Sequence, residues 1–144
     1  MNQPLVLDAS VAIAWFFEDN ERHRSYALAV LDYVVTERPW LVVPPLFHVE
    51  LADFLSRRRR HKPARFSAAD LEEVLRIMAV MRFETRHVQY GYTEILRWAD
   101  EYHLQAKDVP YFMLGKLRGF PIAAIDGGIR QACKAFDVKL LTFA

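Results

Sequence analysis

Short apolar runs alternate with longer amphipathic segments along the chain. The runs Leu5–Leu7, Leu41–Val43 and Ile122–Ile125 are apolar without alternation, which is typical of strands buried on both faces in a parallel sheet. Phe83–Val88 is a weaker strand candidate, and Leu140–Leu141 gives a closing strand. These runs predict a central sheet of parallel strands.

The segments between the strands have helical periodicity and helix end signals. The helices are predicted from the spacing of apolar residues, from the prolines and from a capping-box-like start at Ser67. The first four predicted helices cover Ala9–Phe17, Glu21–Glu37, the segment from Pro45 to a stop at Pro63, and the segment from Ser67 past Met78. The others cover residues 92–103, a segment that begins at Asp108, and residues 129–136. Strands that alternate with helices favour helices on both faces of the sheet. We therefore expect residues 1–144 to form one α/β domain, a three-layer α/β/α sandwich with a mostly parallel sheet.

Composition narrows the class of protein. An apolar fraction of 53% over 144 residues excludes a disordered chain and suits one domain with a real core. The net charge of +1 gives no overall attraction to nucleic acid or membrane, and the apolar run Val11–Phe17 is too short to span a bilayer. The single cysteine, Cys133, cannot form an internal disulfide, so we expect a reducing, cytoplasmic setting, with Cys133 packed in the core.

Four acidic residues stand where a sheet of this kind forms ligand sites. Asp8 and Asp126 end two of the strand runs, Glu50 follows a third, and Asp108 opens a helix. Ligands of open α/β sheets bind at the carboxyl ends of the strands, and Mg²⁺ or Mn²⁺ prefers oxygen donors. The simpler alternative is that these are surface or capping acids, and for Asp108 alone capping is the better explanation.

The residues around these acids resemble the four acidic blocks of PIN-domain ribonucleases. The blocks are Leu7-Asp8-Ala9-Ser10-Val11, His48-Val49-Glu50-Leu51-Ala52, Lys107-Asp108 with Tyr111, and Ile122-Ala123-Ala124-Ile125-Asp126. Their order and spacing are most similar to VapC-type toxins of bacterial toxin–antitoxin pairs, over nearly the whole chain. The resemblance implies a Mg²⁺- or Mn²⁺-dependent endoribonuclease, a small antitoxin partner and commonly a homodimer. It also implies Asp8, Glu50, Asp108 and Asp126 as the metal-holding catalytic acids, with Ser10 nearby.

Two positions depart from the family pattern. Asp53 stands where the family often has asparagine, and Ala124 stands where it often has a hydroxyl residue. Asp53 lies three residues after Glu50, so it either faces the same pocket or pairs with Arg57 four residues further on. The loss of a hydroxyl at Ala124 removes a bond that would orient a metal ligand. The rival to an enzyme is therefore a non-catalytic PIN-like module that binds RNA or protein.

Other polar and aromatic features have two readings. The basic run Arg57, Arg58, Arg59, Arg60 and Lys62 is either a contact for RNA phosphates or a solvated helix end. The histidines show no paired spacing typical of zinc sites. His48 either lies near the rim of the pocket or has a structural role, and we favour the structural role. We expect the aromatic cluster of Trp15, Phe16 and Phe17 to be mostly buried in the core, with part of it exposed.

Overall fold

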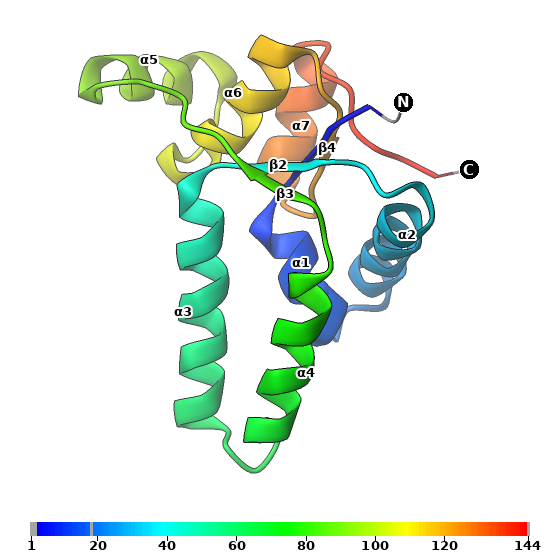
Figure 1. Ribbon diagram of the computed structural model, residues 1–144. Coiled ribbons are helices and arrows are strands. Elements are labelled where there is room, and N and C mark those ends of the chain that lie inside the picture. Colours follow the sequence, from blue (N-terminus) through cyan, green and yellow to red (C-terminus); the bar gives the residue numbers. More distant parts are fainter. Residues whose placement is uncertain (1–2, 18, 144) are drawn as a thin grey trace.

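The computed structural model describes residues 3–17 and 19–143, which form a four-stranded parallel sheet with helices on both faces (Figure 1). The strand order is β3-β2-β1-β4, and every neighbouring pair is parallel. The strands are β1 (Leu5–Leu7), β2 (Leu41–Val43), β3 (Phe83–Thr85) and β4 (Ile122–Ala123). The expected α/β/α sandwich with a mostly parallel sheet is confirmed.

Helices connect each strand to the next. They are α1 (Ala9–Phe17), α2 (Glu21–Glu37), α3 (Pro45–His61), α4 (Ala68–Ala79), α5 (Tyr92–Tyr102), the short 3₁₀ helix η1 (Ala106–Asp108), α6 (Val109–Arg118) and α7 (Gly127–Ala135). In Figure 1, α1 to α4 lie on one side of the sheet and α5 to α7 on the other. The predicted helix ends agree with the structure where the local sequence signals are strong. Ser67 and Asp70 form a reciprocal capping box, and Pro45 occupies the first turn of α3.

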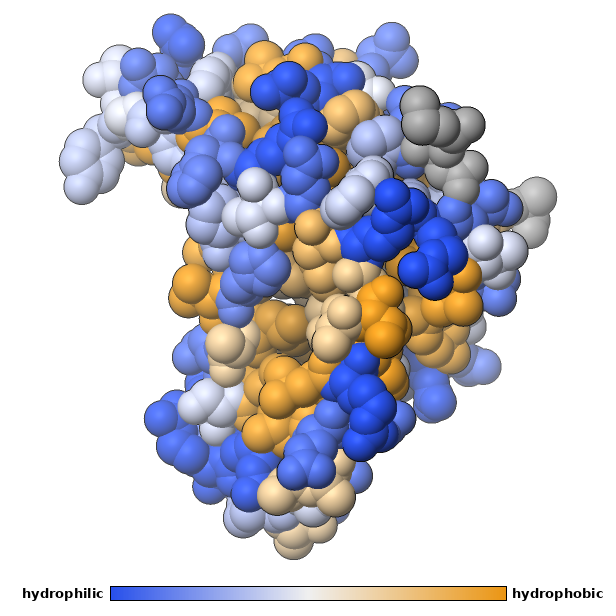
Figure 2. Space-filling view, in the orientation of Figure 1, coloured by the Kyte–Doolittle hydropathy of each residue, from blue (hydrophilic) through white to orange (hydrophobic). Residues whose placement is uncertain are grey.

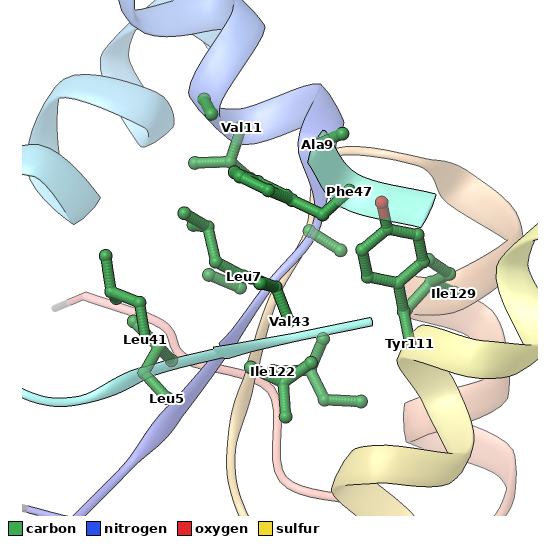
Figure 3. Packing of buried hydrophobic residues seen from close by; sticks show 14 of the residues in the cluster. Leu5, Leu7, Ala9, Val11, Leu41, Val43, Phe47, Tyr111, Ile122 and Ile129 are labelled. Carbon is green, nitrogen blue, oxygen red and sulfur yellow. The ribbon is translucent and has the colours of Figure 1, made fainter. Parts of the chain in front are cut away.

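The core forms where the strand runs meet the helices. Leu5, Val6, Leu7 and the three residues of β2 have no exposed surface, as the unbroken apolar pattern predicts. Figure 3 shows side chains of β1 and β2 packed with Phe47 from α3 and Tyr111 from α6; the labelled strand residues are Leu5, Leu7, Leu41 and Val43. Burial of each such aliphatic side chain stabilises the fold by roughly 1.5–3 kcal/mol, an upper estimate relative to an extended chain.

Two of the predicted strands are shorter than the apolar pattern suggested, and a third is reduced to a bridge. β4 covers only Ile122–Ala123, because the carbonyl of Ala124 accepts a 2.8 Å hydrogen bond from the Arg130 side chain instead of a ladder partner. β3 stops at Thr85, and Leu140 makes only an isolated bridge to Ile122. Asp126 consequently lies in the loop after β4 rather than at the last strand position.

The remaining apolar predictions agree with the structure. Cys133 is 2% exposed, and burial raises the pKa of its thiol to about 11, which fits core packing. Trp15 is buried and donates its indole N–H to the Ala27 carbonyl, while Phe16 and Phe17 are partly buried. No helix within the described part of the chain is long and apolar enough to cross a bilayer.

Candidate metal centre

Asp8 lies at the carboxyl end of β1, next to the end of β4. Its backbone N–H donates to the Ala123 carbonyl at 3.0 Å, which fixes it between the two strands. The residue is 4% exposed, and its carboxylate accepts a hydrogen bond from the Ser10 hydroxyl. Burial raises the pKa of Asp8 to about 6, and the charges of Glu50 and Asp126 act in the same direction. Asp8 is thus a buried carboxyl group with acidic neighbours and a neighbouring hydroxyl.

Asp108, at the start of α6, and Asp126, in the loop after β4, interact with each other. Asp108 precedes α6, but its carboxylate makes no capping bond, so the capping explanation does not account for it. Its side chain is 4% exposed. Burial, followed by the hydrogen bond and charge of Asp126, raises the pKa of Asp108 to about 7. Asp126 itself caps α7 through the Gly128 N–H at 3.3 Å, so it serves both the helix and the acidic group.

Glu50 reaches this group from α3 and is held by a tyrosine of α6. The hydroxyl of Tyr111 donates to Glu50 Oε1 at 2.6 Å. Tyr111 is 1% exposed. Burial and the adjacent Glu50 raise the pKa of Tyr111 well above its usual value, so the phenol stays a neutral donor.

Lys107 provides a positive charge at the rim of the acidic group. Its Nζ lies 3.3 Å from Asp108 Oδ1, although the lysine side chain is 58% exposed. Burial acts to lower the pKa of Lys107, but the charges of Asp108, Glu50 and Asp126 outweigh it and raise the pKa. The ammonium therefore partly neutralises carboxylates that come from four separate segments.

The donor set fits a hard divalent cation. All four acids offer oxygen donors, which Mg²⁺ and Mn²⁺ prefer, and the raised pKa values of Asp8 and Asp108 reflect charges that a cation would stabilise. Within residues 3–17 and 19–143, no three His, Cys, Asp or Glu side chains already stand close enough to hold one metal ion together. The four acids therefore supply the donor chemistry that such a cation prefers, and binding one would require their side chains to move closer together.

Of the residues predicted to support the four acids, one contacts them and another does not. Ser10 contacts Asp8 directly. Asp53 instead pairs with Arg57 at 3.1 Å, and both side chains are more than half exposed, which is the i, i+4 alternative that the sequence left open. Ala124 is fully buried, and the sequence interpretation of a missing hydroxyl there stays a prediction.

The basic run of α3 divides into packed and exposed members. Arg58 stacks over the Phe17 ring at 4.9 Å, and its Nε is buried without a hydrogen-bond partner among the described residues. Arg59 donates to the Phe66 carbonyl at 2.5 Å, which ties the end of α3 to the turn before α4. The exposed members are Arg57, Arg60 and Lys62. Two of the five cations are therefore engaged in packing, Arg58 against α1 and Arg59 against the turn before α4.

Sequence patterns alone gave no role to two residues of the centre, Tyr111 and Lys107. Tyr111 lies three residues after Asp108, a spacing that places both on one helix face and that could have pointed to a shared role. His48 forms a 2.8 Å hydrogen bond with Thr85 at the end of β3, in keeping with the favoured structural role.

Comparisons with known proteins identify the family to which this fold belongs. The family model described as PIN domain matches residues 5–143. Among solved structures, PAE2754 from Pyrobaculum aerophilum is 20% identical with a TM-score of 0.63, over 90% of this chain and 78% of that chain. FitAcB from Neisseria gonorrhoeae is 16% identical with a TM-score of 0.55, over 96% of both chains. A comparison with curated proteins finds no match. At these identities the two structures support the fold, and the family model covers nearly the whole sequence. The chain therefore belongs to the PIN domain family.

Proposed function

We propose that this protein is a Mg²⁺- or Mn²⁺-dependent endoribonuclease, formed by a single domain, that hydrolyses RNA phosphodiester bonds with water as the nucleophile. One observation carries the proposal. Asp8 and Asp108 are almost fully buried, their pKa values are raised to about 6 and about 7, and they interact electrostatically with Asp126, as Asp8 does with Glu50. Such a group is unfavourable without a counter-ion and well suited to hold a divalent cation.

The residues of this chain have separate tasks in the proposed reaction. Asp8, Glu50, Asp108 and Asp126 would hold the cation at the carboxyl edge of the sheet. When bound, the cation supplies Lewis acidity that lowers the pKa of water and stabilises charge on phosphate oxygens. Ser10 restrains the Asp8 carboxylate through its hydrogen bond, and the burial of Asp8 limits exchange with bulk solvent.

RNA would meet the protein through the exposed cations of α3. Arg57, Arg60 and Lys62 are exposed, whereas Arg58 and Arg59 are engaged in packing. Contacts between cations and phosphates give affinity without base selectivity. We therefore assign the exposed cations to backbone contact.

We further propose that the protein is the cytoplasmic toxin of a toxin–antitoxin pair. The support is the VapC-like order of acidic blocks, together with apolar surface available to a small protein partner. Figure 2 shows apolar side chains exposed over α4 and the neighbouring α2. Here a cavity of about 270 Å³ is lined by Val34, Val35, Arg38, Pro39, Ile77, Val80, Met81 and Arg82. A homodimer is also part of the proposal, supported by the exposed Tyr92 and Leu96 of α5.

The experiment that tests the nuclease activity incubates the protein with a panel of structured RNAs. Cleavage is expected with Mg²⁺ or Mn²⁺ and is expected to stop when a chelator is added. Attack by water produces no 2′,3′-cyclic phosphate, so product ends distinguish this reaction from contaminating ribonucleases that use the 2′-hydroxyl. Specific RNA binding without metal-dependent cleavage of any RNA would favour the non-catalytic PIN-like module.

A further inference from the structure

Tyr111 makes a hydrogen bond that joins two distant parts of the acidic group. Its hydroxyl, on α6, donates to Glu50 Oε1, on α3, at 2.6 Å across 61 residues of sequence. The ring is 1% exposed and lies within the core cluster, as Figure 3 shows. A bond of this length from a buried donor to a carboxylate is a strong, charge-assisted one.

The Tyr111 side chain also lies near the segment that carries Asp8, which influences its pKa. In addition to burial and Glu50, the charge of Asp8 raises the pKa of Tyr111, and the backbone of Ala9, the residue directly after Asp8, acts in the opposite direction. Asp108 lies one helical turn before Tyr111, at the start of α6. The hydrogen bond to Glu50 therefore links α3 to the helix that begins at Asp108, close to the segment that carries Asp8.

This link limits how Glu50 presents its charge. A glutamate side chain on a helix has three rotatable bonds, and Glu50 is only partly buried. With Oε1 engaged by Tyr111, the carboxylate loses rotational freedom and Oε2 stays available to a ligand. Partners that orient metal-binding side chains in this way typically change metal affinity by about 10- to 100-fold when they are removed.

We propose that Tyr111 is a positioning residue that fixes Glu50 relative to Asp108 at the start of α6, so that one glutamate oxygen is presented to the divalent cation. This inference rests on the proposed metal-dependent function. The inference goes beyond that function, because it gives a role in metal affinity to Tyr111, whose hydroxyl donates to Glu50 and not to the cation. A ring that merely filled the core would give Tyr111 no such role.

Tyr111→Phe separates these two roles, since it keeps the ring and removes the hydroxyl. Tyr26→Phe is the matched control. The Tyr26 hydroxyl donates to the Leu141 carbonyl at 2.7 Å, and no hydrogen bond described for it involves the four acids. Both variants should melt at a lower temperature than wild type, because each loses one buried or partly buried hydrogen bond. Only Tyr111→Phe should alter metal binding.

The test is calorimetric titration of Mn²⁺ into the RNA-free full chain. We expect Tyr111→Phe to bind Mn²⁺ about tenfold more weakly than wild type, and Tyr26→Phe to bind as wild type does. Because Tyr111 acts through Glu50, adding Tyr111→Phe to a Glu50→Ala protein should cause no further loss of affinity. Circular dichroism and melting curves establish that each variant is folded.

The outcomes distinguish this inference from the proposed function. Wild-type protein that binds no Mn²⁺ would overturn the metal-dependent function and the positioning role with it. Wild-type binding with an unchanged affinity in Tyr111→Phe would overturn only the positioning role. An equal loss of affinity in the wild-type and Glu50→Ala backgrounds would overturn it as well, because Tyr111 would then act through general structure.

Discussion

Lys107 Nζ lies 3.3 Å from Asp108 Oδ1 and is thereby a positive charge at the edge of the carboxylate group. In the metal-free protein this ammonium offsets part of the repulsion among the acids, and it also weakens their attraction for a cation. Lys107→Met should therefore lower the melting temperature of the metal-free protein and increase Mn²⁺ affinity by several-fold. Lys134→Met, which removes an exposed cation of α7, is the control and should change neither quantity. Weaker Mn²⁺ binding by Lys107→Met would show that the lysine supports the bound state instead.

The pH dependence of stability should be unusual for carboxyl groups. Burial raises the pKa of Asp8 to about 6 and that of Asp108 to about 7, whereas an unfolded aspartate has a pKa of about 3.9. The folded protein thus binds these protons more tightly, so folding stability falls as pH rises from about 4 to about 7. Urea midpoints measured across this range without metal should decrease.

The variant Asp8→Asn with Asp108→Asn isolates this effect, because it removes both titrating groups and should flatten the decrease. Saturating Mn²⁺ should also flatten it in the wild type, since a bound cation stabilises the ionised forms. A wild-type profile that is already flat over the same range would contradict the raised pKa values.

Asp53 is expected to be outside the metal centre. It pairs with Arg57 at the surface of α3, so Asp53→Asn should leave Mn²⁺ affinity unchanged and cost at most about 0.5 kcal/mol of stability. Calorimetric titration of Mn²⁺ into the variant and the wild type checks this. A clear loss of affinity would return Asp53 to the acidic group, which is the other reading of its sequence position.

The exposed cations of α3 should contact the RNA backbone without reading its sequence. Arg57→Gln with Arg60→Gln should weaken binding of different RNAs alike and reduce the slope of log affinity against log salt by about one unit per lost contact. The measurement uses the Asp8→Asn background, which is expected to be inactive, so that the RNA is not cleaved. An unchanged slope would indicate that these arginines do not contact the RNA backbone.

Arg59→Gln serves as the contrasting variant. Arg59 donates to the Phe66 carbonyl, so its loss should lower the melting temperature by disturbing the turn between α3 and α4. Its effect on RNA binding should be smaller than that of the exposed pair. If Arg59→Gln instead weakens RNA binding without destabilising the fold, the division of the basic run into packed and exposed members is wrong.

Sequence patterns predicted the elements whose signals are local. β1 and β2 follow directly from uniformly apolar runs, and the start of α4 follows from the capping box of Ser67 and Asp70. β4 was predicted two residues too long, since Ala124 and Ile125 are apolar but lie past the last ladder pair. An apolar run indicates buried residues rather than strand residues, and the chain remains buried at Ala124, after β4 has ended.

The candidate site was predictable as residues but not as contacts. Asp8 and Asp126 could be placed near the sheet edge from strand ends alone. The hydrogen bond between Tyr111 and Glu50 spans 61 residues and depends on how α6 packs against α3, which no local pattern encodes. Asp53 has two neighbours at helical spacing, Glu50 and Arg57, and only the structure distinguishes between them.

The most direct test of the account compares RNA cleavage rates as Mn²⁺ is titrated into wild type, Asp126→Asn and Asp100→Asn. Asp100 is an exposed acid on α5 and serves as the control for loss of one negative charge. We predict saturable Mn²⁺-dependent cleavage by wild type and Asp100→Asn, and a loss of at least about 100-fold in the folded Asp126→Asn protein, a difference of about 2.7 kcal/mol in the barrier. Full activity of Asp126→Asn, or cleavage that persists in chelator, would contradict the carboxylate-held metal centre.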